Sequence, residues 1–192
     1  LRGKLMQSSE EGKMMAILGL DSKIIDEVCS QINESNEKAY VASANYNSMK
    51  QTVIAGNIEG IKIASNLLPG IGAKRCIELN VSIASHTRLM TDAADEFNES
   101  LQKIVFSLPR YPIIQNHTGK IETDLSSIKQ NLLNQLIEPV LWTKTMENIS
   151  NSASCLIEIG PKNILCGLSK GYDLLSILYM ADLNFKDKVQ NI

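Results

Sequence analysis

Residues 13–82 alternate between strand-like and helix-like patterns in an order that few folds accommodate. Short apolar or alternating runs predict strands, and apolar residues three and four positions apart predict helices. Together these segments follow the order strand, helix, strand, strand, helix, strand, which is the split βαβ, or ferredoxin-like, pattern. The expected strands cover residues 13–19, 40–46, 52–55 and 75–81, and the expected helices cover 21–32 and 57–68.

Capping signals mark the ends of the expected helices. Asp21 and Asn57 stand just before the two helices of this unit, and Asp124 stands before a third helix that runs to residue 136. Their short polar side chains can accept hydrogen bonds from the free N–H groups of a first helical turn. Pro69 and Gly70 are expected to end the second helix, because proline and glycine both interrupt helical periodicity.

The strand expected at 75–81 leads into the stretch that carries the chemistry. Ile77, Leu79 and Val81 alternate with polar residues and are expected to face the core. An amphipathic helix is expected soon after His86, and the positive end of a helix dipole favours a neutral, basic imidazole. His86 is therefore a candidate general base, although an isolated histidine can equally be a satisfied core residue. The second histidine, His117, lies beside a turn and is expected to be exposed.

The remaining residues, 83–192, have a looser α/β pattern. Residues 112–116 and 174–180 are expected to be strands, and 163–168 is expected to be a short helix. The mostly apolar run 155–159 is typical of a strand buried in a parallel sheet. We therefore expect an α/β region beside the ferredoxin-like unit.

Composition excludes several classes of partner. The net charge of −2 favours neither nucleic acid nor a membrane surface. No apolar run approaches the roughly 20 residues that span a bilayer. The four cysteines lack paired spacing, which favours a reducing compartment such as the cytoplasm and argues against a disulfide framework or a metal site. We expect a cytoplasmic monomer.

Ordered segments along nearly the whole chain resemble the malonyl-CoA:acyl carrier protein transacylases. The acyltransferase domains of fatty-acid and polyketide synthases share the same general plan. Several segments in order are more specific than any single short motif. The segments that carry the resemblance are residues 2–7, 15–20, 45–48, 51–56, 81–86, 135–142 and 158–161.

The resemblance implies a fold and a division of the chain. The family has an α/β-hydrolase-like acyltransferase domain with an inserted ferredoxin-like α+β subdomain. Residues 13–82 would be the small inserted subdomain, and residues 1–12 and 83–192 would belong to the large one. The resemblance also implies that this is a C-terminal portion lacking the segment with the nucleophile, so the chain alone is expected to be inactive.

The resemblance further implies an activity and a site. The family transfers malonyl from malonyl-CoA to the phosphopantetheine thiol of acyl carrier protein through a serine acyl-enzyme, which feeds fatty-acid synthesis. His86 would be the catalytic base, and Arg2 would hold the free carboxylate of the malonyl group. The backbone carbonyl of Gln135 would accept the other ring N–H of His86. No cofactor is implied, because the CoA thioester is the substrate.

Residues 167–171 match the Gly-x-Ser-x-Gly pattern, but Ser169 is not expected to be the nucleophile. A nucleophile elbow needs a strand that leads directly into the serine. Here Pro161 breaks the preceding strand, and residues 163–168 read as a helix. Ser169 is therefore expected to be structural.

Two alternatives remain open from the sequence. The chain could be a non-enzymatic ferredoxin-like binding module, or the acyltransferase domain of a polyketide synthase. Ser85, before the histidine, often accompanies methylmalonyl in polyketide synthases, whereas the resemblance to the discrete enzymes favours malonyl. An upstream Gly-His-Ser-x-Gly sequence would separate the enzyme from the binding module.

Overall fold

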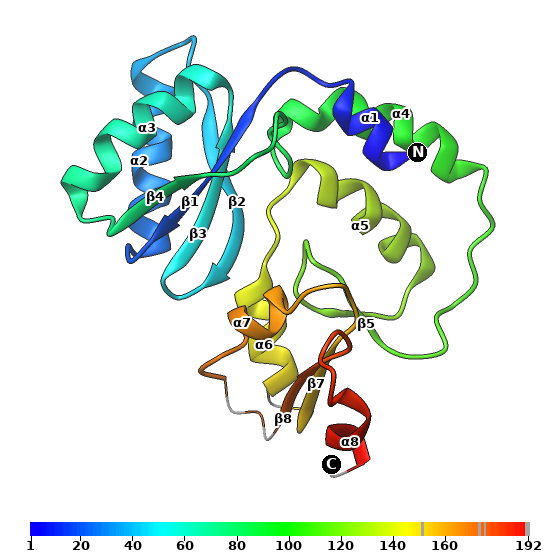
Figure 1. Cartoon of the computed structure of the whole chain (residues 1–192). Coiled ribbons are helices and arrows are strands. Elements are labelled where there is room, and N and C mark those ends of the chain that lie inside the picture. The colour runs from blue at the N-terminus through cyan, green and yellow to red at the C-terminus, as the bar shows by residue number, and fades with distance from the viewer. Residues whose placement is uncertain (151, 173, 175, 191–192) are drawn as a thin grey trace.

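The computed structural model describes residues 1–150, 152–172, 174 and 176–190. Figure 1 shows a sheet with helices at one side, a group of helices around α1, α4 and α5, and a C-terminal part containing β7 and β8. The chain starts in the helical group, enters the sheet through β1, and returns after β4.

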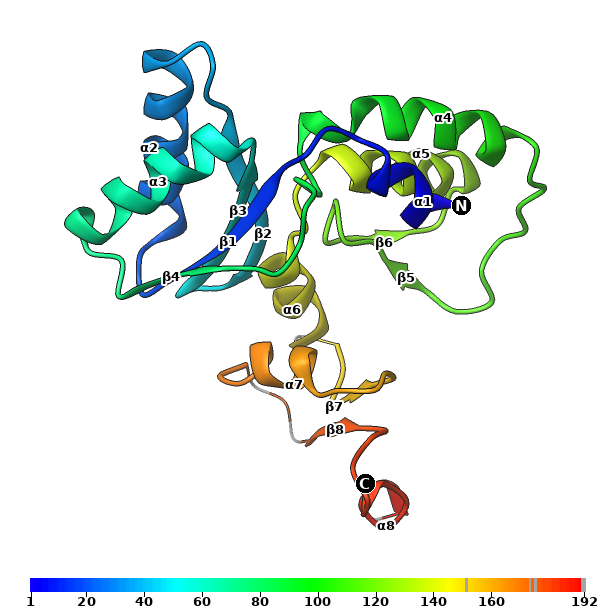
Figure 2. The same cartoon turned by 45° about the horizontal axis from the view of Figure 1, so that its top comes forward.

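The first sheet has the strand order β2-β3-β1-β4, with every neighbouring pair antiparallel. This is the ferredoxin-like arrangement predicted from the sequence. Helices α2 and α3 cover one face, as Figure 2 shows from a second side. The strands are β1 (Lys13–Leu18), β2 (Val41–Ser48), β3 (Gln51–Gly56) and β4 (Arg75–Glu78), and the helices are α2 (Ser22–Ser35) and α3 (Ile58–Ile71).

Alternation along β1 gives the sheet a core on each face. Met15 and Ile17 point toward α2 and α3, where they join a large aliphatic cluster. Met14 and Ala16 point to the opposite face and join a smaller cluster that includes Ala84. Successive side chains of a strand lie on opposite faces, so a strand with apolar residues at every position belongs in the middle of a covered sheet. The segment before His86 thus packs directly on the sheet.

The expected caps are confirmed. The side chain of Asp21 accepts from the backbone N–H of Lys23 at 2.8 Å, and that of Asn57 accepts from Gly60 at 2.9 Å. Pro69 does not end its helix as expected. Helix α3 continues to Ile71 and ends at Gly72, whose φ of 116° is the left-handed conformation that glycine adopts readily.

The expectation that Ile77, Leu79 and Val81 face the core is wrong for Ile77 and Val81, although Leu79 is partly buried against the smaller cluster. Ile77 and Val81 are 46% and 44% exposed, whereas Cys76 packs against the cluster under the helices. Register explains this, because Cys76 lies opposite the fully buried Ile17, and directly opposed residues point to the same face. Strand β4 also ends at Glu78, three residues earlier than expected.

The helical group packs around a core of its own. Leu5, Met90 and Leu136 come from three separate segments and meet in one buried cluster. A 3-10 turn separates the His86 loop from the helix that was expected to follow it more directly. The elements are α1 (Arg2–Gln7), the 3-10 turn η1 (Arg88–Met90), α4 (Thr91–Gln102) and α5 (Leu125–Ile137).

The strands outside the sheet unit are short and form two separate pairs. The strand expected at 112–116 is only β5 (Ile113–Ile114), which pairs antiparallel with β6 (Ile121–Glu122), a strand the sequence analysis missed. The run at 155–159 forms β7 (Cys155–Glu158) and pairs parallel with β8 (Ser176–Tyr179). It is not buried as expected, because Ile157 is 41% exposed. Residue 175, within the strand expected at 174–180, lies outside the described residues.

Three further helices connect or follow these strands: α6 (Trp142–Ser150), α7 (Ile164–Leu168) and α8 (Phe185–Gln190). None of the helices in the described part of the chain is both long and apolar enough to cross a membrane.

Candidate active site

His86 lies where the chain leaves the sheet unit and reaches the C-terminal turn of α5. Its backbone N–H donates to the carbonyl of Leu136 at 3.0 Å, and its ring Nδ1 lies 2.6 Å from the carbonyl oxygen of Gln135. The last carbonyls of a helix have no partner within the helix, so they are available to such a group. Two consecutive carbonyls of α5 thus hold both the backbone and the ring of His86.

This contact fixes the tautomer of the imidazole. A carbonyl oxygen only accepts, so Nδ1 carries the proton and donates it to Gln135. Nε2 is then left with a lone pair. The predicted contact between His86 and the Gln135 carbonyl is confirmed, and it involves the backbone of Gln135, not its side chain.

His86 also has a strained backbone. Its φ of 63° makes it the one non-glycine residue with a positive φ in the described part of the chain. Such a conformation is uncommon for residues with a side chain and costs of order 1–3 kcal/mol, and it persists only where surrounding contacts hold it. The bonds to Gln135 and Leu136 supply those contacts.

The surroundings keep the imidazole neutral. Burial is the main cause that lowers the pKa of His86, and the positive charge of Arg2 lowers it further. The hydrogen bond to Gln135 acts in the opposite sense but does not outweigh burial. A helix dipole was expected to favour the neutral base, but the causes that lower the pKa of His86 are desolvation and then the charge of Arg2, and the element that follows His86 is a short 3-10 turn.

Arg2 stands in the first turn of α1, within electrostatic reach of His86. Its Nε is buried and has no hydrogen-bond partner in the described structure, and burial lowers the pKa of its guanidinium. A buried donor without a partner costs free energy. A partly buried guanidinium with a free donor can bind a carboxylate, because the carboxylate accepts two parallel N–H bonds from the planar fork of the guanidinium.

Ser169 has none of the features of a nucleophile. It follows helix α7, is fully buried, and donates its hydroxyl to the carbonyl of Leu165 at 2.8 Å. The hydroxyl also lies 3.3 Å from the sulfur of Met146. Its expected structural role therefore agrees with its placement.

Two features near His86 were not anticipated. Thr87 is almost completely buried and donates its hydroxyl to the carbonyl of Ala84 at 2.7 Å, which closes the turn that contains His86. The same hydroxyl accepts from the N–H of Leu89 at 3.3 Å and so caps the 3-10 turn. The position of a threonine just before a helical turn was a signal that could have revealed this cap. His117 is half-buried, not exposed, and its Nε2 lies 3.5 Å from the amide nitrogen of Asn134. No group of three or more potential metal ligands occurs among the described side chains.

Comparison with known proteins shows which enzymes this chain is similar to. The malonyl CoA-acyl carrier protein transacylase of Salmonella typhimurium is 42% identical over 174 residues, which cover 88% of this chain and 55% of that protein. The Bacillus subtilis transacylase is 36% identical over 173 residues, covering 88% of this chain and 54% of that protein. The chain is homologous to part of the malonyl CoA-acyl carrier protein transacylases.

Solved structures agree with this homology. FabD from Acinetobacter baumannii superposes with a TM-score of 0.93 at 34% identity, covering 99% of this chain and 62% of that one. A malonyl-transacylase in complex with a type II PKS acyl-carrier protein gives a TM-score of 0.90 at 36% identity, covering 100% and 63%. The chain therefore has the α/β fold of these acyltransferases, and it spans about half the length of the curated relatives it matches. No family model matches it.

Proposed function

We propose that the intact protein transfers a malonyl group from malonyl-CoA to the phosphopantetheine thiol of acyl carrier protein, for fatty-acid synthesis. The observation that carries this proposal is that His86, with its ring held by the Gln135 carbonyl and its pKa lowered, lies within electrostatic reach of Arg2, whose buried Nε has no hydrogen-bond partner among the described residues. Malonyl-CoA has the two groups that such a pair would serve, a thioester to be attacked and a free carboxylate to be bound. The transacylase homology supports the same choice of substrate and carrier.

In the first half-reaction, Nε2 of His86 takes the proton of a serine hydroxyl that lies outside residues 1–192. The serine oxygen attacks the thioester carbon, a C–O bond forms, and the C–S bond to CoA breaks. His86 then returns its proton to the departing thiolate. Such a base must have its lone pair free at neutral pH, and the lowered pKa of His86 meets that requirement.

In the second half-reaction, the same nitrogen takes the proton of the phosphopantetheine thiol. The sulfur attacks the acyl-serine, the C–O bond breaks, and the serine oxygen recovers a proton from His86. The bond from Nδ1 to the Gln135 carbonyl keeps the ring in one orientation through both steps. The imidazole begins and ends each half-reaction neutral.

Arg2 would select the acyl group by its charge. Its guanidinium loses hydration through partial burial, so a substrate carboxylate would satisfy donors that the described residues leave unpaired. An acetyl group offers no such acceptor. We therefore assign Arg2 to recognition of the malonyl carboxylate, and no metal or cofactor is required.

The test compares acyl groups that differ only in this carboxylate. Arg2→Ala in the intact protein should lower kcat/KM for malonyl-CoA by about 10²–10³-fold, as for loss of a charged bidentate partner. Transfer from acetyl-CoA should fall much less or rise. Arg2→Lys should rescue poorly, because an ammonium lacks the planar fork. Lys4→Ala, an exposed basic residue two positions further along α1, is the matched control and should leave both rates unchanged.

Equal losses on malonyl-CoA and acetyl-CoA would contradict the carboxylate role and leave Arg2 as a structural or CoA-binding residue. Malonyl transfer to the carrier protein of polyketide synthesis, but not to that of fatty-acid synthesis, would assign the protein to polyketide synthesis. One solved relative is in complex with a type II PKS acyl-carrier protein. Activity with neither carrier would contradict the proposed function.

A further inference from the structure

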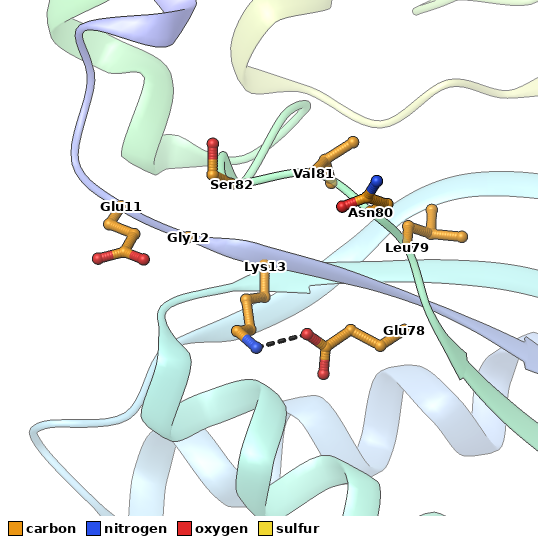
Figure 3. A pocket seen from close by; sticks show the side chains of 8 residues that line it. All are labelled: Glu11, Gly12, Lys13, Glu78, Leu79, Asn80, Val81 and Ser82. Carbon is orange, nitrogen blue, oxygen red and sulfur yellow. Dashed lines mark hydrogen bonds and ion pairs between the residues drawn. The ribbon is translucent and has the colours of Figure 1, made fainter.

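The two chain segments that connect the sheet unit to the helical group run against each other close to His86. The N–H of Leu79 donates to the carbonyl of Met14 at 2.9 Å, and the N–H of Gly12 donates to the carbonyl of Ser82 at 3.0 Å. An isolated antiparallel bridge joins Glu11 and Ile83. Figure 3 shows these segments side by side, with Lys13 and Glu78 joined by an ion pair. Residues of both segments line a hollow of about 520 Å³. Beyond the sheet the two segments thus pair again, shifted by one residue from the register of β1 and β4.

Gly12 is the point of closest approach between these segments. A Cβ built at Gly12 would lie 2.7 Å from the Cβ of Ala84, 2.7 Å from its backbone nitrogen, and 3.0 Å from the carbonyl oxygen of Gly56. Carbon atoms do not approach within about 3.5 Å without repulsion. Gly56 lies in β3, within the core of the sheet, and Ala84 is fully buried. Any side chain at residue 12 must therefore displace one of the two connecting segments.

Ala84 and His86 belong to the same closed turn. The carbonyl of Ala84 accepts the hydroxyl of Thr87, so residues 84 to 87 form one closed turn with His86 inside it. The left-handed φ of His86 leaves little freedom to absorb a shift within that turn. On its far side, the turn is held by α5 through the carbonyls of Gln135 and Leu136.

We propose that Gly12 is a positioning residue for His86. Because residue 12 has no side chain, Ala84 can pack against the sheet unit, and this packing sets the position of the imidazole relative to the Gln135 carbonyl. The functional meaning of that position rests on the proposed role of His86 as the base. The placement itself is a property of the fold and is measurable without activity.

The first test is Gly12→Ala in the intact protein, with NMR of the His86 ring as the readout. We expect the Nδ1–H and ring-carbon signals of His86, assigned by their loss in His86→Asn, to shift, and its pKa to move toward the ordinary histidine value as the ring loses burial. We expect kcat to fall by about 10²-fold with little change in KM, because a misplacement of about 1 Å can have that effect. Gly70→Ala is the matched control, since a Cβ there meets nothing within 4 Å, and it should leave all these quantities unchanged.

A second pair keeps the proposal testable if Gly12→Ala does not fold. Ala84→Gly and Ala16→Gly each remove one buried methyl group from the same cluster, but only Ala84 belongs to the turn that contains His86. We expect similar decreases in Tm for the two variants, with altered His86 signals only in Ala84→Gly. A folded Gly12→Ala with unchanged His86 signals would overturn the proposal, and so would Ala16→Gly shifting those signals as strongly as Ala84→Gly.

These outcomes are separable from failure of the proposed function. If His86→Asn keeps its activity, His86 is not the base, yet the NMR comparison still decides whether Gly12 positions its ring. If His86→Asn is inactive and Gly12→Ala keeps both its signals and its rate, the base assignment stands and the role of Gly12 falls.

Discussion

The sheet unit and the region around His86 are built in opposite ways. The sheet unit is one continuous stretch of chain whose two helices enclose a large core against one face of the sheet, while Ala84 from outside the unit joins the smaller cluster on the other face. The region around His86 is assembled from three separate segments of the chain, which are α1, the consecutive elements η1 and α4, and α5, and these share one smaller core. Its functional contacts use helix-end carbonyls and a residue with strained backbone. The difference teaches that a compact, locally specified unit can hold an irregular site in place.

This comparison has a physical basis. Regular elements satisfy their own backbone groups, so residues within them contribute mainly through packing. Helix ends and loops leave donors and acceptors free, and these groups can bind and orient a catalytic side chain. Substitutions in the two regions should therefore differ in kind, with loss of stability in one and loss of chemistry in the other.

The largest expected effect is on chemistry. His86→Asn removes the base but suits the left-handed backbone, which asparagine tolerates better than most residues. We expect turnover in malonyl transfer to fall by about 10²–10⁴-fold, while Tm stays close to that of the parent protein. Steady-state rates and thermal melts on the same samples make the measurement. A variant with the parent rate would remove His86 from the mechanism, and a large drop in Tm would make it a structural residue.

The next effect is on stability. Ile54 is fully buried in β3, within the cluster under α2 and α3. Ile54→Ala should lower the free energy of unfolding by about 2–5 kcal/mol, while the NMR titration of His86 in the folded state stays the same. Chemical denaturation measures the loss of stability, and the NMR titration measures whether the pKa of His86 is unchanged. A change in the pKa of His86 would contradict the expectation that substitutions in the sheet unit affect stability alone.

A smaller loss is expected from a polar contact at the sheet edge. The side chain of Asn33 donates to the carbonyl of Val41 and accepts from its N–H, both at 2.9 Å, which satisfies a backbone position at the start of β2. Asn33→Ala should cost about 1–3 kcal/mol, because two backbone groups lose their partner. The control Asn98→Ala removes only an exposed side-chain bond to Gln102, and its change should stay within about 0.5 kcal/mol. Equal losses for both variants would contradict the assignment.

The smallest expected effect concerns pH. Burial and then Arg2 lower the pKa of His86 below its ordinary value of 6.5, so the unfolded chain binds this proton more readily than the folded one. The stability associated with neutral His86 is present above that ordinary value and is lost as the pH falls through the folded pKa. Arg2→Gln removes one of the two lowering causes and should raise the folded pKa. An NMR titration of His86 that shows no rise would contradict electrostatic contact between the two residues.

The sheet unit was largely predictable because its signals are local. The N-caps at Asp21 and Asn57 lie within three residues of the groups they bind, and strand alternation reflects contacts repeated along each strand. The prediction failed where pairing with a neighbouring strand decides which face of a strand is buried. The face of β4 follows from the position of Cys76 opposite Ile17, and no pattern within residues 75–81 contains that register.

The site was predicted only where family resemblance pointed to it. Arg2 and Gln135 were named only in this way, whereas His86 was already a candidate from its place between an expected strand and an expected helix, and the structure brings His86 against the Gln135 carbonyl with Arg2 in electrostatic reach. The left-handed backbone of His86 and the close approach at Gly12 were not anticipated. Both arise from contacts between segments that are separated by tens of residues.

The sequence by itself determined the order of helices and strands in the sheet unit, its helix starts, and the residue types available for acyl transfer, since these depend on neighbours along the chain. Only the tertiary structure decided which face of β4 is buried, that the imidazole carries its proton on Nδ1, and that Arg2 leaves a buried nitrogen without a partner. Burial, tautomer and pKa are set by the atoms that surround a group in space. For His86 those atoms include Arg2 of α1 and the carbonyls at the end of α5, and folding alone brings them together.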